Sequence, residues 1–185
     1  MFEIKQQIKI FDDLIDPFLQ DYFQSIIYGK TDKGQILPTV DFTVKYELTA
    51  QEGDFIPMSF IHVLKSSFKT SPHFENFGKI PLAVCQHIKA NLKDVHFARI
   101  FLTLPYKTSL EYAAPHTDMA MPHWVVLYYV NDADGDTVFF DKHNNIVERV
   151  TPKKGRVVFF NGNILHGGGI PKEFPRCAVN FDISI

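Results

Sequence analysis

The sequence is poor in several residue types, and each shortage excludes a class of protein. Its two cysteines, Cys85 and Cys177, are too few for a disulfide framework and are typical of a reducing compartment. Lys and Arg total 19 against 21 Asp and Glu, a net charge of −2, so the basic excess of a nucleic-acid-binding protein is lacking. The longest apolar run, residues 124–130, is far too short to span a bilayer.

The chain also lacks the marks of a targeted or disordered protein. Its first residues mix charged and apolar side chains, so no uninterrupted signal-peptide core occurs. Hydrophobic residues make up 45% of the 185, which is enough apolar mass to form a core. We therefore expect one soluble, cytoplasmic domain over residues 1–185, with no nucleic-acid or membrane partner. The sequence does not indicate an oligomeric state.

Helical patterns are confined to the first half of the chain. Asp16-Pro17 is typical of an N-cap followed by proline at the first helical position, and Gly29 ends the apolar repeat that follows. A second helix is predicted from residue 71, with a broken start at Gly78. A strand is predicted over 39–46. We expect residues 1–91 to support the rest of the domain.

After Asn91 the pattern changes to short apolar runs rich in Val, Ile, Phe and Tyr, separated by turn residues. Eight strands without an intervening helix predict a jelly roll, also called a double-stranded β-helix, over residues 92–185. The fold class is therefore α+β, with the N-terminal helices packed on one sheet. The predicted strands are Val95–Leu104, Leu110–Thr117, His123–Val130, Thr137–Asp141, Ile146–Val150, Arg156–Phe160, Ile164–Gly168 and Cys177–Ile185.

A metal site is predicted around His116 and Asp118. On a strand, residues two apart project from the same face, so this imidazole and carboxylate can bind one metal together. His166, 48 residues beyond Asp118, is the candidate third ligand. Two histidines and one carboxylate leave coordination positions open, an arrangement that suits Fe(II) oxygenase chemistry.

The context of His116 separates it from a second match to the same pattern. His73 and Glu75 also form a His-x-acid pair, but at a predicted helix start, where residues two apart diverge. We interpret that pair as structural. By contrast, one of only four arginines, Arg176, follows His166 by ten residues.

With these residues in order, the sequence over 95–185 resembles the 2-oxoglutarate-dependent Fe(II) oxygenase superfamily. That family's pattern is His-x-Asp, a distal His and a basic residue about ten positions later. The closest likeness is to the prolyl 4-hydroxylase-like branch, in which a Tyr-Tyr strand follows the motif and leads into a glycine turn. Here these are residues 128–131 and 134–137.

The resemblance implies both the cofactors and the site residues. His116, Asp118 and His166 would be the catalytic iron ligands, and dioxygen would be the oxidant. Arg176 and Tyr129 would hold the distal carboxylate of the cosubstrate 2-oxoglutarate. Two further cosubstrate-binding residues are expected: Tyr106 matches a tyrosine position of some hydroxylases, and Asn180 shares strand parity with Arg176.

The resemblance implies a hydroxylase that acts on a C–H bond of a protein, peptide or small-molecule substrate, with peptidyl proline as one candidate. Arg176 resembles the oxygen-sensing type more than the collagen type, which usually has Lys there. Asp182 stands where related nucleic-acid demethylases carry a second Arg. Two alternatives stay open: a cupin-like metal-binding jelly roll with another activity, and a noncatalytic binding domain.

Further residues are assigned around the predicted site. We expect pocket walls from Val126, Phe159, Phe160 and Phe181. His123 shares parity with Tyr129 and is a candidate for the pocket mouth, whereas Arg99 is either a substrate contact or a surface charge. Residues 51–60 or 106–115 are candidates for a lid.

Overall fold

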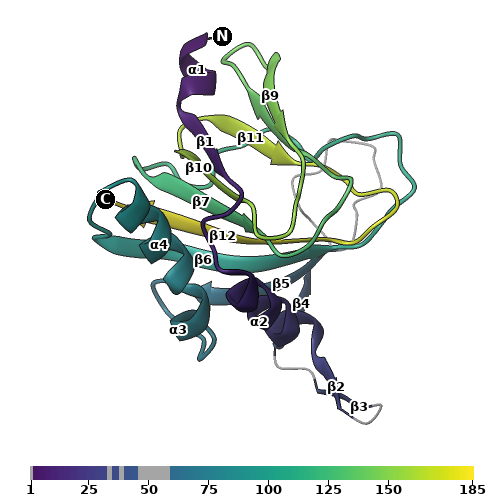
Figure 1. Ribbon diagram of the computed structural model, residues 1–185. Helices are drawn as coiled ribbons and strands as arrows, with labels where there is room; N and C mark the ends of the chain where they lie inside the picture. The colour runs from purple at the N-terminus through teal and green to yellow at the C-terminus, as the bar shows by residue number, and fades with distance from the viewer. Residues whose placement is uncertain (1, 33–34, 38–39, 46–58) are drawn as a thin grey trace.

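The computed structural model describes residues 2–32, 35–37, 40–45 and 59–185 of the chain. Strands dominate its second half, and the helices lie in the first (Figure 1). The helices are α1 (Phe2–Gln6), α2 (Pro17–Tyr28), α3 (Phe74–Phe77) and α4 (Lys79–His87). The strands are β1 (Ile8–Phe11), β2 (Lys30–Asp32), β3 (Gln35–Leu37), β4 (Thr43–Lys45), β5 (Ser59–Lys65), β6 (Asp94–Thr103), β7 (Trp124–Tyr129), β8 (Thr137–Phe140), β9 (Ile146–Val150), β10 (Val157–Asn161), β11 (Leu165–Gly168) and β12 (Arg176–Ser184).

Two antiparallel sheets form the body of the molecule. The large sheet has seven strands in the order β1-β10-β7-β12-β6-β5-β4, and the small sheet has three in the order β11-β8-β9. Strands β2 and β3 make a separate hairpin. Neighbours in the run β1-β10-β7-β12-β6 are distant in sequence, as a jelly roll requires, whereas β6, β5 and β4 are successive strands of the chain. The predicted α+β class and jelly-roll core are therefore confirmed.

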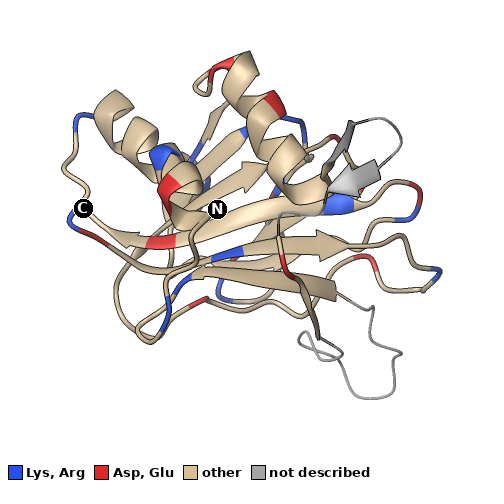
Figure 2. Ribbon diagram, turned by 90° about the horizontal axis from the view of Figure 1, so that it is seen from below, with Lys and Arg blue, Asp and Glu red and all other residues tan. Residues whose placement is uncertain are grey.

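The large sheet is covered on both faces (Figure 1). The helices lie on one face, where Phe23 of α2 packs edge-on against Tyr128 of β7, with ring centroids 5.9 Å apart. Figure 2 shows the helices crossing this face. The small sheet covers the other face, where Tyr129 of β7 joins Phe139 of β8 in a second buried cluster. Because adjacent strand residues point to opposite faces, Tyr128 and Tyr129 belong to different layers.

Local sequence explains the helices on the outer layer. The Asp16 carboxylate accepts a hydrogen bond from the backbone N–H of Phe18 at 2.9 Å, which caps α2 ahead of Pro17. The predicted break at Gly78 is confirmed, because it separates α3 from α4. Proline is tolerated at position 81 because it lies in the first turn of α4, where an N–H has no intrahelical partner.

One predicted strand is wrong. Residues 110–117 form no strand and make only two isolated bridges, Tyr112 with Gly169 and His116 with His166. Pro115 has no N–H to donate to a ladder, so the segment touches β11 at single points. The other seven strands predicted after residue 91 are present, with ends shifted by at most one residue. Of the strand predicted over 39–46, residues 43–45 form β4, and 39 and 46 lie outside the described residues.

The first half of the chain does more than supply helices. It contributes β1 at one edge of the large sheet and β4 and β5 at the other. Strand β1 pairs with β10 through the register Ile8↔Phe160 to Phe11↔Val157. A bidentate ion pair between Asp12 and Arg156, at 2.6 and 2.9 Å, fixes the segment that follows β1. The jelly roll is thus completed from residues before 92.

Candidate metal and cosubstrate site

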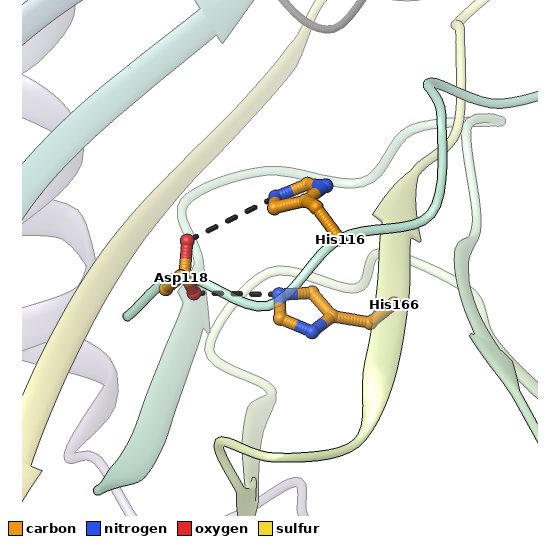
Figure 3. Close-up of side chains that lie close together, drawn as sticks. All are labelled: His116, Asp118 and His166. Atoms are coloured by element: carbon orange, nitrogen blue, oxygen red, sulfur yellow. Dashed lines mark ion pairs between the residues drawn. The ribbon is translucent and has the colours of Figure 1, made fainter. Parts of the chain in front are cut away.

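The predicted triad assembles at one end of the small sheet (Figure 3). His116, Asp118 and His166 each offer a ligand atom, and these atoms lie within 4.8 Å of one another. His116 and Asp118 come from the loop between β6 and β7, and His166 comes from β11. The two histidines face each other because His116 N–H donates to the His166 carbonyl at 2.9 Å and His166 N–H donates back at 3.0 Å.

Backbone hydrogen bonds orient both imidazoles. Nδ1 of His116 lies 3.0 Å from the carbonyl oxygen of Ala114, and Nδ1 of His166 lies 2.9 Å from that of Ile164. A carbonyl oxygen only accepts, so in each ring Nδ1 carries a proton and Nε2 faces the centre of the triad. Burial lowers the pKa of His116, which favours the neutral imidazole that metals bind.

Asp118 is the most deeply buried member of the triad, with a side chain 3% exposed. Its Oδ2 lies 3.3 Å from Nε2 of His166, and its Oδ1 lies 3.9 Å from Nε2 of His116. Burial acts to raise the pKa of Asp118. The hydrogen bond and charge of His166, together with the charge of Arg99, outweigh burial and hold the pKa below its usual range. The carboxylate is therefore ionised and ready to bind a cation.

Two strand residues hold the Asp118 carboxylate, one at each oxygen. Arg99 Nη2 lies 2.6 Å from Oδ1, and Asn180 Nδ2 donates to Oδ2 at 3.2 Å. Arg99 and Asn180 are directly opposite in the β6–β12 register, so both side chains leave the same face of the large sheet. Arg99, for which the sequence allows either a substrate contact or a surface charge, is thus a partner of the carboxylate predicted to bind the metal.

The second group of predicted residues meets beneath β8. Arg176 donates from Nη2 to the Thr137 hydroxyl at 2.8 Å and from Nε to the Gly135 carbonyl at 2.9 Å. The Tyr129 hydroxyl donates to the same Thr137 oxygen at 2.6 Å, and burial raises the pKa of Tyr129, so it stays a donor. The Thr137 oxygen thus accepts two hydrogen bonds, one from Arg176 and one from Tyr129. Its own hydroxyl proton remains available to donate to a further acceptor.

The sequence does not predict a role for Thr137 beyond its place on a strand. Its local context carries little signal, because a threonine on a strand is common. Its position depends on the β8–β11 register, which sets Thr137 opposite Gly168. That pairing brings the hydroxyl to Arg176, whose Nη1 lies 3.7 Å from where a side chain on Gly168 would begin.

The Arg176 guanidinium is a buried charge that has no ion-pair partner in the part of the chain that the structure describes. The residue is 7% exposed, and its hydrogen bonds run to a neutral hydroxyl and a neutral carbonyl. Among the described residues, no carboxylate forms an ion pair with it. A buried cation is costly unless it is paired, so this arrangement favours an anionic ligand at the same place.

Asn180 and Tyr106, the other two residues predicted to bind the cosubstrate, make different contacts from Arg176 and Tyr129. The Asn180 amide lies at Asp118 and also donates to Asp182 at 3.3 Å, which connects it to the metal side of the site. Tyr106 is half-buried, and its backbone N–H donates to the Pro171 carbonyl at 3.0 Å. Its role in binding a cosubstrate stays a prediction.

Three of the four predicted pocket walls are wrong. Val126, Phe159 and Phe181 lie in the core cluster on the helix side of the large sheet. Their strands are apolar on both faces, so hydrophobicity does not tell which side chain faces the site. Phe160 is confirmed on the inner face, where its ring meets that of His166 edge-on at 4.9 Å between centroids.

The other assignments near the site have mixed outcomes. The His123 ring is buried beside Gly162, with Nε2 3.9 Å from Asp182 Oδ1. The pair interpreted as structural stays apart from the triad, since His73 stands at the N-terminal end of the four-residue helix α3. Residues 106–115 are bonded along 168–171, and most of the other candidate lid, residues 51–58, lies outside the described residues.

A cavity of about 660 Å³ opens beside the triad. Asp118 and Arg99 line it, so it reaches the carboxylate that would hold the metal. Phe97 and Met119 add apolar wall, and Asp182 adds a polar one. Burial, together with the charge of Asp118, raises the pKa of Asp182 to about 7. A volume of this size is typical of small-molecule or short-peptide sites.

Solved structures share this architecture at low sequence identity. An oxidoreductase of the 2OG-Fe(II) oxygenase family from Burkholderia pseudomallei is 11% identical, with 97% of this chain and 86% of that chain covered and a TM-score of 0.70. A prolyl hydroxylase from Trichoplax adhaerens, in complex with a hypoxia inducible factor peptide fragment, is 12% identical, with 96% and 83% covered and a TM-score of 0.59.

A third similar structure has a different reaction in its name. The non-heme α-ketoglutarate-dependent epimerase SnoN of nogalamycin biosynthesis is 10% identical, with 98% and 80% of the chains covered and a TM-score of 0.67. No family model and no curated protein sequence matches the chain. The chain thus has the fold of the 2-oxoglutarate Fe(II) oxygenases, including that of prolyl hydroxylases. In the described residues, no helix has the length and apolar character needed to cross a membrane.

Proposed function

We propose that the protein is a 2-oxoglutarate-dependent Fe(II) dioxygenase that hydroxylates a C–H bond of its substrate. The observation that carries the proposal is the meeting of His116, Asp118 and His166 within 4.8 Å at one end of an oxygenase-type jelly roll. Arg176 supports it, because this buried cation forms no ion pair with a carboxylate of the described residues and a metal-only jelly roll would not need it.

Fe(II) fits the donor set of this site. Two neutral imidazole nitrogens and one ionised carboxylate are the ligands of the facial triad of non-heme iron oxygenases. The Nδ1 hydrogen bonds to backbone carbonyls hold both rings with Nε2 available, as is usual for metal-binding histidines. When bound, iron with 2-oxoglutarate and dioxygen supplies the oxidation, and succinate and carbon dioxide are the coproducts.

The chain's own residues bind and orient the cosubstrate. Arg176 presents a planar guanidinium that matches a carboxylate, and the Thr137 hydroxyl and Tyr129 ring fix its position. Phe160 and Phe139 exclude water from the ring of His166. The 2-oxoglutarate carboxylate would supply the counter-charge that Arg176 lacks among the described residues.

The substrate would enter through the cavity beside Asp118. Its apolar wall at Phe97 and Met119 suits an aliphatic group, and its volume of about 660 Å³ admits either a short peptide segment or a small molecule. Peptidyl proline is one such group, and the likeness to a prolyl hydroxylase fold supports testing it first.

The decisive assay measures succinate. Protein purified without oxygen is loaded with Fe(II) and 2-oxoglutarate, air is admitted, and succinate is quantified with and without proline-containing peptides. Succinate above the level of the Asp118→Ala variant is expected. Correctly folded, iron-loaded protein that neither binds 2-oxoglutarate nor forms succinate would overturn the proposal and favour a cupin-like or binding role.

A further inference from the structure

Arg99 does more than neutralise a buried carboxylate, because its guanidinium is held in place from several sides. It lies over the Phe101 ring, 4.3 Å from the centroid, and 5.3 Å from that of Phe97. Its Nε is buried and has no hydrogen-bond partner in the described part of the chain. The strand register with Asn180 fixes its backbone. The group therefore presents Nη2 to Asp118 from a rigid base.

The contact divides the two oxygens of Asp118 between different partners. Oδ1 lies 2.6 Å from the guanidinium, a short charge-assisted distance. Oδ2 lies 3.3 Å from His166 Nε2 and accepts only a longer hydrogen bond, at 3.2 Å, from the neutral Asn180 amide. His116 Nε2 lies 3.9 Å from Oδ1, so the imidazoles reach both oxygens and the guanidinium holds only one of them. An oxygen engaged this strongly by arginine is a poor second ligand, so the carboxylate is prepared to give a metal only one oxygen.

We propose that Arg99 is a positioning residue that keeps Asp118 a one-oxygen ligand and thereby preserves an open coordination position for 2-oxoglutarate. The inference rests on the proposed function. A facial triad leaves three positions of a six-coordinate metal open, and the keto acid end of 2-oxoglutarate uses two of them. A carboxylate that bound through both oxygens would occupy one of these positions.

The affinity for the metal and the affinity for 2-oxoglutarate should respond differently to the loss of Arg99. If Arg99 served only to hold the fold, its loss would weaken metal and cosubstrate binding together. If it sets the binding mode of the carboxylate, its loss frees Oδ1 and removes a competing positive charge. The metal alone is then bound as well as before or more tightly, while binding of 2-oxoglutarate to the metal becomes weaker.

The experiment uses Mn(II) in place of Fe(II), so that no turnover is involved. Mn(II) affinity is measured by the electron paramagnetic resonance signal of the free ion, and 2-oxoglutarate affinity for the Mn(II)-loaded protein is measured by calorimetry. Arg99→Met is expected to keep or improve Mn(II) affinity and to weaken 2-oxoglutarate by about tenfold, a typical effect of altering a group behind a metal ligand. Arg99→Lys should restore part of the loss.

Arg149→Met is the matched control, because Arg149 also binds a carboxylate, that of Glu111, through two nitrogens. Neither residue belongs to the triad, and both are exposed to solvent. It should leave both affinities unchanged. Equal binding by Arg99→Met and wild type, or a parallel loss of both affinities, would overturn the inference. If the Met variant does not fold, Arg99→Lys is subject to the same comparison. Wild-type protein that binds neither ligand would overturn the proposed function itself.

Discussion

Arg176 is buried, and it forms no ion pair with a carboxylate of the described residues. The family resemblance implies that its guanidinium binds the distal carboxylate of 2-oxoglutarate. Arg176→Met keeps the length of the side chain and removes its charge. It should weaken 2-oxoglutarate binding by about 2–5 kcal/mol, the usual loss when one partner of a buried charge pair is removed.

Metal binding should be nearly unaffected in this variant, because Arg176 contacts Thr137 and Gly135 and none of the triad. Calorimetry with Mn(II) and then with 2-oxoglutarate separates the two effects. Arg149→Met again serves as the control for loss of an arginine. Unchanged cosubstrate affinity would remove Arg176 from the site.

Asp182 leads to a prediction about pH. Burial and the charge of Asp118 raise the pKa of Asp182 to about 7 in the folded protein, against an ordinary value of about 3.9 when unfolded. Between these values the folded state binds more protons than the unfolded state. The contribution of this group to the free energy of unfolding is therefore fully present below pH 4 and is lost as the pH rises through 7.

Asp182→Asn removes the ionisable group, so the stability that the wild type loses at high pH is retained. The variant keeps a side-chain oxygen that accepts from the Asn180 amide. In metal-free protein, the variant should gain stability over wild type by about 1–3 kcal/mol at pH 8.5, the cost of a poorly compensated buried group, and much less at pH 4.5. Urea denaturation at both values measures the difference. Asp13→Asn, at an exposed position, reports the effect of the substitution alone. An equal gain at both pH values would contradict the prediction.

At the scale of elements, glycines allow two segments to cross beside Arg176. Gly169 follows β11, and a Cβ there would lie 2.4 Å from the Asp136 carbonyl oxygen and 2.7 Å from the Gly135 carbonyl carbon. No side chain fits so close to backbone. The Gly135 carbonyl in turn accepts from Arg176. The close approach of the two segments thus positions the Gly135 carbonyl, which is one of the two groups that accept hydrogen bonds from the Arg176 guanidinium.

Gly169→Ala should therefore lower the free energy of unfolding by about 1–3 kcal/mol through overpacking and also weaken 2-oxoglutarate binding. Gly168→Ala is the control for stability, because its Cβ would meet nothing nearer than 3.7 Å. Urea denaturation of both variants measures the difference. Equal stability of the two would show that the backbone at 135–136 moves away without cost.

Strand prediction succeeded where the physical signal is local and failed where it is not. The runs at 95–104 and 177–185 are long, apolar and bounded by turns, and both are strands in the structure. The run at 110–117 has similar composition, but Pro115 has no N–H to donate to a ladder. The segment therefore makes isolated bridges and no strand. His116 and Asp118 therefore converge through a loop, although the prediction that they converge was correct.

What the sequence could not supply is the register between distant strands. The pairing of Arg99 with Asn180 across β6 and β12, and of Thr137 with Gly168 across β8 and β11, decides which side chains meet. Neither register has a local signature, since it depends on how the whole sheet packs. Alternation along one strand did place Tyr129 and Tyr128 correctly on opposite faces.

At the scale of the whole molecule, the triad spans two parts of the chain that are distant in sequence and that backbone hydrogen bonds already hold side by side. His116 and Asp118 lie in the loop between β6 and β7, and His166 lies in the small sheet. A metal ion that binds all three adds a link present only in the folded state. Such a ligand stabilises folding by an amount set by its concentration relative to its dissociation constant, about 2.7 kcal/mol at a hundredfold excess.

Mn(II) should accordingly raise the melting temperature of the wild type, and His116→Ala should abolish this increase. His73→Ala is the informative control, because His73 belongs to the same His-x-acid pattern but lies at the start of α3, outside the triad. It should respond to Mn(II) as the wild type does. The increase should also fade as the pH falls through the range in which the imidazoles take up protons, since protonated histidine does not bind metal. Loss of the Mn(II) response in His73→Ala, or its persistence in His116→Ala, would place the metal elsewhere on the molecule, because among the described residues His116, and not His73, belongs to a cluster of three ligand atoms within 4.8 Å of one another.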